Sequence, residues 1–328
     1  MNARPDLSTR PETDTQPPAR DLVLQQLVAI RERPLFSPID ATITPGTLLG
    51  LVGPNGTGKS SLLSAVVGSG VQTSGAVHYG DVDLHDLRPR HLAGVLSYMT
   101  QDSYAPNELR VRDVVGVGAR ATHRPGSTDA RVLAALQRLG VAHLADRRYA
   151  RLSGGERQLV QVARVLAQDA PVMLLDEPTA ALDLGHQLTV MHVLAQRAAA
   201  GHIVIVTMHD LTQALRWADQ VAVIAAGTAT FGAPQEVITP ELIRSVYGVT
   251  AEVFSSPSGS PTLSLVRPSC PTAAVFTGHE WVTGRGPFSD RESFIGRGSS
   301  SNHESTSNHE SFTEHQPITH RDRSGARR

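Results

Sequence analysis

The sequence predicts an α/β fold with a mainly parallel central sheet, and three observations lead to this prediction. Short apolar runs such as Leu48–Val52 and Val172–Leu175 show no alternation with polar residues, which is typical of strands buried on both faces of a sheet. Longer stretches with helical periodicity separate these runs, as parallel strands require. A glycine-rich loop follows the first run, and two carboxylates follow the second. Ligands of such folds bind beyond the carboxyl ends of the strands, so the same runs mark the expected site.

Further elements follow from the same patterns. Residues 203–206 and 221–224 are apolar runs of the same kind, and residues 60–67 are expected to form the helix after the glycine loop. Between residues 101 and 152 the strand signal fades, while 131–139 and 141–145 have helical periodicity. The sequence therefore predicts a helical insertion in this part of the chain.

Composition excludes several classes of protein. The net charge of −1 gives no indication of broad nucleic-acid or anionic-membrane binding. A single cysteine, Cys270, rules out an intrachain disulfide framework and is typical of a reducing compartment. The longest apolar runs are too short to span a bilayer, and residues 1–20 lack the apolar core of a signal peptide. We expect a cytoplasmic protein that meets a membrane only through a partner.

The chain has three zones by composition. Residues 1–20 are expected to be a disordered arm, residues 21–267 a folded domain, and residues 268–328 a low-complexity, disordered tail. The tail contains His303, His309, His315 and His320. Their spacing does not resemble a closed ligand set, which favours a solvated tail over a weak transition-metal site.

The glycine-rich loop predicts a phosphate-binding site. The segment 53–60 matches G-x-x-x-x-G-K-[ST], and Lys59 is the only lysine among 328 residues. A compact ammonium reaches phosphate oxygens through an opening too narrow for a planar guanidinium, which explains why lysine occurs only here. Backbone N–H groups of the loop and the start of the following helix are expected to surround a nucleoside triphosphate. The loop residues predicted to bind it are Gly53, Pro54, Asn55, Gly56, Thr57, Gly58, Lys59, Ser60 and Ser61.

The two carboxylates predict the chemistry. Asp176 is expected to hold Mg²⁺, the hard cation that accompanies nucleotide phosphates, together with the Ser60 hydroxyl. Glu177 is expected to lie closer to the γ-phosphate and to polarise the attacking water. The reaction predicted from these residues is hydrolysis of the nucleotide.

A third element indicates the family. Leu152 is followed by Ser153, Gly154, Gly155 and Glu156, and then by a helix with one apolar face. Two glycines and a hydroxyl at a helix N-terminus form a second anion site, although one chain needs a single phosphate-binding site. With the other motifs, this segment resembles the LSGGQ signature of the ATP-binding cassette (ABC) family, over residues 21–267. The resemblance implies a P-loop NTPase core with an antiparallel β subdomain and an inserted α-helical subdomain, at about residues 101–165.

The resemblance also implies roles for single residues. In that family two cassettes pack head to tail, and the signature of one covers ATP bound to the other. Gln101 resembles the glutamine that senses Mg²⁺, Asp183 the residue of the loop facing the partner copy, and His209 the histidine at the γ-phosphate. Arg31 or Ile30 stands where an aromatic residue normally stacks on adenine. The sequence departs from the family at Glu156, where Gln is usual, and at Thr100, where Pro is common.

Finer similarity points to the iron-siderophore importer branch. The segments 182–187 and 232–249 resemble stretches of that branch, and His186 is expected to be a surface contact there. The implied protein is an ATPase subunit at the cytoplasmic face of the membrane, peripheral to a permease that docks near Gln101 and residues 102–115. The resemblance also implies an extracytoplasmic binding protein that supplies the cargo. A haem, cobalamin or metal-ion importer remains an alternative, as does a soluble ABC ATPase, which a single cassette without heptad repeats or a basic patch disfavours.

Overall fold

The computed structural model describes residues 20–101, 108–122, 127–256, 259 and 261–266, and the backbone of residues 274–277 and 280–283. The chain divides into two units, residues 1–268 and 269–328. Residues 1–19 of the predicted arm, most of the predicted tail with its four histidines, and residues 102–107 of the predicted docking segment lie outside the described residues.

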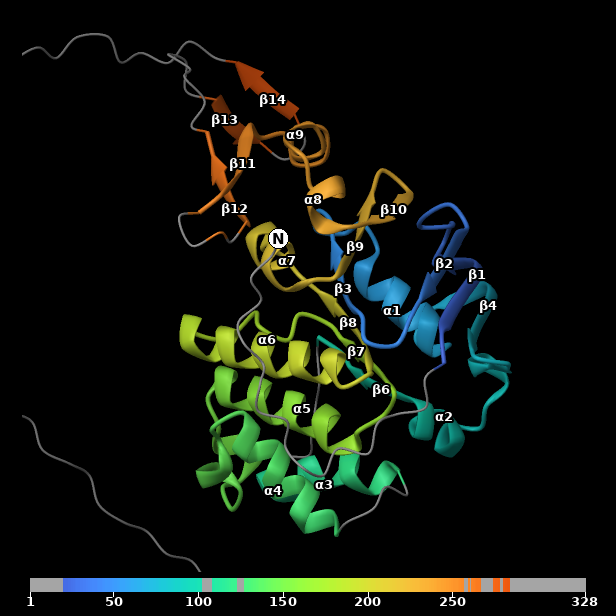
Figure 1. Cartoon of the computed structure of the whole chain (residues 1–328), viewed down its shortest axis with the longest axis vertical. Helices are drawn as coiled ribbons and strands as arrows, with labels where there is room; N and C mark the ends of the chain where they lie inside the picture. Colours follow the sequence, from blue (N-terminus) through green and yellow to red (C-terminus); the bar gives the residue numbers. More distant parts are fainter. Residues whose placement is uncertain are drawn as a thin grey trace, which may run out of the picture. The chain divides into compact units, whose positions relative to one another are not determined.

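A six-stranded sheet of order β10-β9-β3-β8-β7-β6 forms the centre of the first unit (Figure 1). All neighbouring strands are parallel except β10, which pairs antiparallel with β9. The strands are β3 (Leu48–Val52), β6 (Leu96–Met99), β7 (Val172–Leu175), β8 (Ile203–Thr207), β9 (Gln220–Ala225) and β10 (Thr228–Gly232). The predicted mainly parallel sheet is confirmed.

The runs without alternation are explained by two cores, one on each face of this sheet. Successive side chains of a strand point to opposite faces. In β7, Met173 and Leu175 therefore enter one core, and Val172 and Leu174 enter the other. Every strand residue meets apolar neighbours, so no polar residue is needed at alternate positions.

A four-stranded antiparallel sheet of order β2-β1-β4-β5 belongs to the second of these cores. It appears in blue at the right of Figure 1. Its strands are β1 (Leu22–Ile30), β2 (Ile39–Ile43), β4 (Gln72–Tyr79) and β5 (Val82–Asp83). The short helices η1 (Leu84–Asp86) and α2 (Pro89–Val95) connect it to β6. This sheet is the antiparallel subdomain that the family resemblance implied.

The predicted helical insertion is present between β6 and β7, in green at the foot of Figure 1. It consists of α3 (Val111–Ala121), α4 (Thr128–Arg138), η2 (Ala142–Leu144), η3 (Tyr149–Arg151) and α5 (Gly154–Gln168). Leu159, Val162, Ala163 and Leu166 of α5 are buried on one face, as expected. A Cβ at Gly118 would overlap the Arg164 carbonyl oxygen, so glycine is what lets α3 approach α5 closely.

The prediction of a helix at residues 141–145 is wrong, because only the single 3₁₀ turn η2 forms there. Gly140 adopts a φ of 72° and ends the preceding helical segment. The carbonyls of Ala145 and Arg147 then accept hydrogen bonds from the backbone N–H groups of Arg112 and Val111, at 3.0 Å each. These contacts with the start of α3 take the place of the bonds that would continue a helix.

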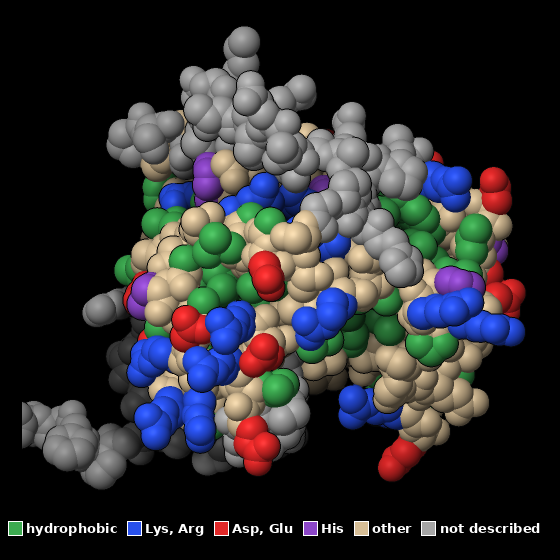
Figure 2. Space-filling model, turned by 90° about the horizontal axis from the view of Figure 1, so that it is seen from below, with side chains coloured by type: hydrophobic (Ala, Val, Ile, Leu, Met, Phe, Trp, Pro, Cys, Tyr) green, Lys and Arg blue, Asp and Glu red, His purple; other side chains and the backbone are tan. Residues whose placement is uncertain are grey.

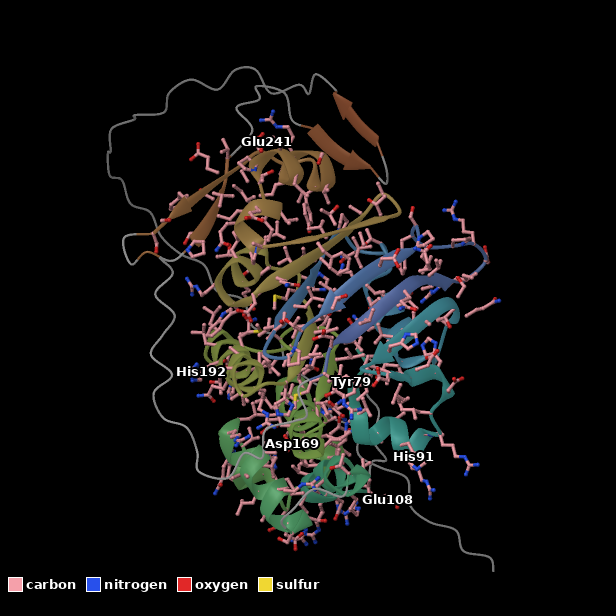
Figure 3. The ribbon with its side chains drawn as sticks, turned by 45° about the vertical axis from the view of Figure 1, so that its right-hand side comes forward. Tyr79, His91, Glu108, Asp169, His192 and Glu241 are labelled. Carbon is pink, nitrogen blue, oxygen red and sulfur yellow. The ribbon has the colours of Figure 1, made fainter. Side chains whose placement is uncertain are left out.

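Helix α6 (Leu184–Ala199) precedes β8, and α7 (Leu211–Trp217) follows it. His192 of α6 and Asp169, which follows the last residue of α5, are labelled in Figure 3. His192 packs edge-on against Trp217, and Asp169 forms an ion pair with Arg197 of α6. The remaining elements of the unit are α8 (Pro234–Val237), α9 (Pro240–Tyr247), β11 (Ala251–Ser255) and β12 (Pro261–Leu265).

The second unit contains a hairpin of β13 (Ala274–Thr277) and β14 (Glu280–Thr283) within the tail predicted to be disordered. Both segments contain valine, threonine and an aromatic residue, which are residue types that favour strands. The surrounding tail is rich in Ser and Gly instead. In the described part of the chain no helix is both long and apolar enough to cross a bilayer.

Candidate functional site

The glycine-rich loop connects β3 to helix α1 (Lys59–Val67), as predicted. Gly53, Gly56 and Gly58 have φ angles of 148°, 79° and 102°, in the region that favours glycine. At Gly53 a Cβ would also overlap the carbonyl oxygen of Ile224 on β9, so the loop can leave the sheet here only without a side chain. The loop and α1 thus present backbone N–H groups at the carboxyl edge of the sheet.

A cavity of about 430 Å³ lies at this loop. It joins loop residues to Glu177 and His209, predicted to act on water and the γ-phosphate, and to Gln101, predicted to sense Mg²⁺. Its lining residues are Arg31, Leu35, Asn55, Gly56, Gly58, Lys59, Ser60, Ser61, Gln101, Glu177 and His209. Gly53, Pro54 and Thr57 of the loop do not line it, and the Thr57 hydroxyl donates a hydrogen bond to the Pro54 carbonyl at 3.0 Å.

Lys59 is held by the loop itself. Its Nζ donates hydrogen bonds to the carbonyl oxygens of Gly53 at 2.8 Å and Pro54 at 2.9 Å. Burial lowers the pKa of the ammonium, and the carboxylates of Glu177 and Asp176 oppose that shift. An ammonium has three donors, so one remains for a phosphate oxygen in the cavity.

Glu177, the predicted catalytic carboxylate, contacts both His209 and Gln101. Its Oε1 lies 2.6 Å from Nε2 of His209, and its Oε2 accepts a hydrogen bond from Nε2 of Gln101 at 3.3 Å. Asp176 comes directly before it at the end of β7 and is buried, with only 2% of its surface exposed. The structure therefore brings together three residues that are far apart in the sequence and orients one carboxylate between two polar partners.

The donor set at this edge suits Mg²⁺. Ser60 contributes a hydroxyl, and Gln101 retains its amide oxygen because it contacts Glu177 through nitrogen; both residues line the cavity. Asp176 contributes a carboxylate from the adjacent end of β7, but it is buried and does not line the cavity itself. Among the described residues no group of three or more His, Cys, Asp or Glu side chains forms a metal cage. A small number of protein ligands is typical of Mg²⁺ sites in which nucleotide phosphates complete the coordination.

The signature segment starts helix α5. The Ser153 Oγ accepts a hydrogen bond from the Glu156 N–H at 3.2 Å, and the Glu156 carboxylate accepts from the Ser153 N–H at 2.7 Å. This reciprocal pair is a capping box. Because Ser153 acts as an acceptor in the box, its own O–H remains available to donate to a phosphate.

Glu156, the departure from the usual Gln, has a structural explanation. The Ser153 backbone hydrogen bond and the Arg147 guanidinium, whose Nη1 lies 3.1 Å from Oε1, hold the pKa of Glu156 below its ordinary value. Glutamine also completes a capping box, but only the carboxylate forms the ion pair with Arg147.

The remaining predicted residues lie apart from the cavity. Ser153, Gly154, Gly155 and Glu156 do not line it. Asp183 does not line it either: it caps α6 and binds His186, whose Nδ1 lies 2.9 Å from its carboxylate. A site built from both the cavity residues and the signature residues would therefore need the signature of another copy of the chain.

Sequence reasoning missed three contacts of the site. Leu35 lines the cavity next to Arg31, whereas Ile30 belongs to β1 and does not line it. The Gln158 amide donates to the Glu177 carbonyl at 2.7 Å. The phenol of Tyr247 on α9 accepts from the Gly53 N–H, and burial raises its pKa to about 12. These contacts join distant elements, and no local motif marks them.

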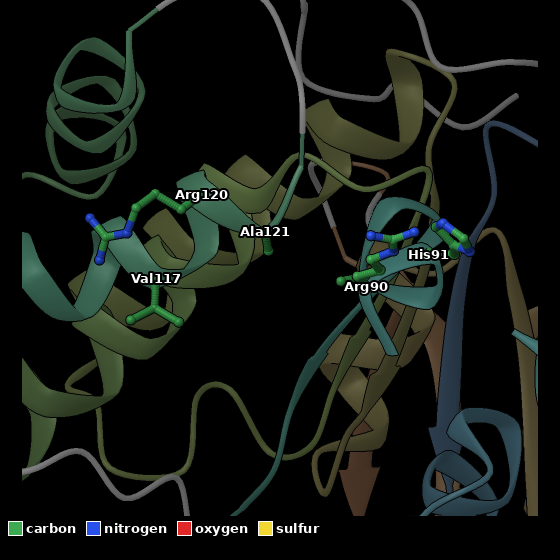
Figure 4. Close-up of a pocket in the computed structure, with 6 residues that line it drawn as sticks. Arg90, His91, Val117, Arg120 and Ala121 are labelled. Carbon is green, nitrogen blue, oxygen red and sulfur yellow. The ribbon is translucent and has the colours of Figure 1, made fainter. Parts of the chain in front are cut away.

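A second hollow of about 780 Å³ lies between α2 and α3, lined by Arg90, His91, Ala93, Val117, Arg120 and Ala121 (Figure 4). Val117 is exposed over 52% of its surface there. The molecule seen from below has basic, acidic and uncharged side chains interspersed on this face (Figure 2). The hollow thus combines apolar surface with a few positive charges.

Comparison with known proteins identifies the family of this chain. Residues 36–180 match the ABC transporter family. A hemin import ATP-binding protein of Bordetella bronchiseptica is 44% identical over 239 residues, covering 69% of this chain and 90% of that protein. The corresponding protein of Rhodococcus jostii is 40% identical and covers 72% and 82%.

Solved structures agree as well. A chain of an inward-facing transporter, described as an ABC transporter of the metal-chelate type, superposes with a TM-score of 0.64 at 25% identity, covering 76% of this chain and 99% of that chain. An ATP-binding cassette in its ADP conformation gives 0.58 at 21% identity, covering 70% and 98%, and supports the fold alone. The predicted family is confirmed: this chain belongs to the ABC transporter family as an ATP-binding subunit that hydrolyses ATP.

Proposed function

We propose that this chain hydrolyses ATP to energise the import of haem through a separate membrane permease. The observation that carries the cargo is the identity of 40–44% to hemin import ATP-binding proteins from Bordetella and Rhodococcus. Haem was an alternative in the sequence analysis, which favoured a ferric siderophore. The comparisons favour haem over the siderophore, because every relative at this level of identity reported above is named for hemin import.

We assign the roles within one site as follows. The loop N–H groups and Lys59 bind the β- and γ-phosphates. Ser60, Asp176 and Gln101 would hold Mg²⁺, which would supply positive charge to the phosphate oxygens. Glu177 accepts a proton from the attacking water. His209 contacts the γ-phosphate, and its Nε2 lies 2.6 Å from Oε1 of Glu177.

Closure of the site requires two copies. Ser153, Gly154, Gly155, Glu156 and Asp183 lie away from the cavity of their own chain. In a head-to-tail homodimer the signature of one copy covers the ATP bound by the other, with the free O–H of Ser153 donating to its γ-phosphate. Hydrolysis then separates the copies, and the movement passes to the permease.

Mixed dimers test this arrangement. Lys59→Ala and Ser153→Ala chains are each expected to be nearly inactive as homodimers. A 1:1 mixture is expected to recover about a quarter of wild-type ATPase activity, because half of the dimers are mixed and each has one undamaged site. Steady-state phosphate release measures this recovery. A mixture no more active than either variant alone would contradict the composite site.

The hollow between α2 and α3 supplies the permease contact in this proposal. Val117 offers apolar surface, and Arg90 and Arg120 offer positive charge for carboxylates or helix C-termini of the permease. Residues 102–107 of the docking segment predicted from the sequence lie outside the described residues, but its last five residues, 111–115, form the start of α3. We propose that the protein is bound to the permease at the cytoplasmic face of the membrane, and that an extracytoplasmic binding protein delivers cargo to the opposite side.

Uptake assays test the cargo. Cells that contain this ATPase with the permease that co-purifies with it are supplied with hemin, a ferric siderophore or cobalamin. We expect uptake of hemin alone, lost in cells carrying Lys59→Ala. Uptake of a ferric siderophore without hemin would leave the ATPase function intact and reject the haem cargo.

A further inference from the structure

The backbone of Glu177 has an unusual conformation. Its φ of 50° lies in the left-handed region, which side chains other than glycine rarely adopt. It also precedes Pro178, and a residue before proline favours extended conformations. Such a residue keeps this conformation only when its surroundings hold it there, and such residues concentrate at functional sites.

Thr207 supplies one of the groups that hold it. In the parallel pairing of β7 with β8, Leu175 is opposite Val206, so Thr207 lies beside the point where β7 passes into Asp176 and Glu177. The Thr207 Oγ1 accepts a hydrogen bond from the Glu177 N–H at 2.6 Å and donates one to the Asp176 Oδ1 at 2.7 Å. One hydroxyl thus binds both residues of the acidic pair.

Thr207 occupies a buried strand position of the kind that apolar residues usually fill. The preceding residues of β8 are Ile, Val, Ile and Val, and Thr207 is exposed over only 1% of its surface. A buried hydroxyl needs hydrogen-bond partners, and both partners of this one belong to the acidic pair. Thr207 itself does not line the cavity, so it does not touch nucleotide there.

We propose that Thr207 is a positioning residue for ATP hydrolysis, whose hydroxyl holds Glu177 in the orientation that directs its carboxylate between His209 and Gln101. The Gln158 amide holds the other side of the same residue through the Glu177 carbonyl, at 2.7 Å. With its N–H and C=O both bound, Glu177 cannot relax towards the extended backbone that Pro178 favours. This inference rests on the role proposed above for Glu177.

The test uses substitutions that separate the hydroxyl from the shape of the side chain. Thr207→Val keeps the shape and removes the hydroxyl, whereas Thr207→Ser keeps the hydroxyl. We expect Thr207→Val to lower kcat about 10- to 100-fold, since small displacements of a reacting group have effects of this size. The KM for ATP should change less than about threefold, and Thr207→Ser should restore most of the turnover. Thr207→Ala provides a second variant without the hydroxyl if the valine variant does not fold.

A buried threonine elsewhere provides the matched control. Thr122 is also buried and donates to the Gln168 carbonyl at 2.8 Å, far along the chain from the acidic pair. Thr122→Val is expected to lower Tm by a similar amount and to leave kcat unchanged. Equal losses of kcat in the two valine variants, or no recovery with Thr207→Ser, would overturn the proposal.

A double variant distinguishes this inference from the proposed function. If Thr207 acts through Glu177, then Glu177→Gln together with Thr207→Val should turn over no more slowly than Glu177→Gln alone. A further loss in the double variant would overturn the inference. Wild-type turnover by Glu177→Gln would instead reject the role proposed for Glu177 itself.

Discussion

Replacing Glu177 by Gln is expected to lower kcat about 10²- to 10⁴-fold, the range found for removal of a general base. The amide keeps the shape of the side chain and its neighbours His209 and Gln101, but it does not accept the proton of the attacking water. ATP binding should persist, because the change removes a negative charge beside the phosphates. The measurements are kcat from phosphate release and the Kd for ATP from equilibrium titration.

The same variant is expected to accumulate as an ATP-bound dimer, since hydrolysis no longer separates the two copies. Size-exclusion chromatography with and without ATP detects this dimer. Glu241→Gln is the matched control, because Glu241 is exposed on α9 and away from the cavity. Turnover of Glu177→Gln equal to that of this control would reject Glu177 as the base.

Replacing Lys59 by Arg is expected to weaken ATP binding about 10- to 100-fold, although the charge is unchanged. The Lys59 Nζ fits between the carbonyl oxygens of Gly53 and Pro54, and the side chain is buried. A planar guanidinium is too wide for that space and carries its donors in a fixed fork. Loss of one hydrogen bond to a charged phosphate corresponds to about 1.5–3 kcal/mol, which gives the expected range.

The opposite exchange on an exposed surface is the control for this variant. Arg244→Lys on α9 should leave the Kd for ATP and Tm unchanged. If Lys59→Arg binds ATP within about twofold of wild type, then charge alone explains the lysine, and the geometric account of the loop is wrong.

The sequence was sufficient for most of the sheet. The runs at Leu48–Val52 and Val172–Leu175 match β3 and β7 residue for residue, because burial on both faces leaves a local mark that needs no knowledge of neighbouring strands. The error at residues 141–145 has the opposite cause. Their backbone carbonyls bond to the start of α3, some 30 residues earlier in the chain, and helical periodicity does not contain that information.

The predicted site divides in the same way. Gly53, Lys59 and Ser60 are adjacent in sequence, so their spacing alone identified them. Leu35 reaches the site from the segment after β1, Gln158 from α5 and Thr207 from β8, and only tertiary packing brings them there. Thr207 in particular looks like one more β-branched residue of a buried strand.

By itself, the sequence determined the family, the order along the chain of the motifs that follow the strands, and the identity of the phosphate-binding loop with its single lysine. These features depend on residues close together along the chain, whose chemistry survives without tertiary contacts. Only the tertiary structure decided that Glu177 stands between His209 and Gln101, that Thr207 and Gln158 hold its backbone, and that the signature lies outside its own chain's cavity. Those facts depend on strand register and helix packing, which bring together groups separated by tens of residues.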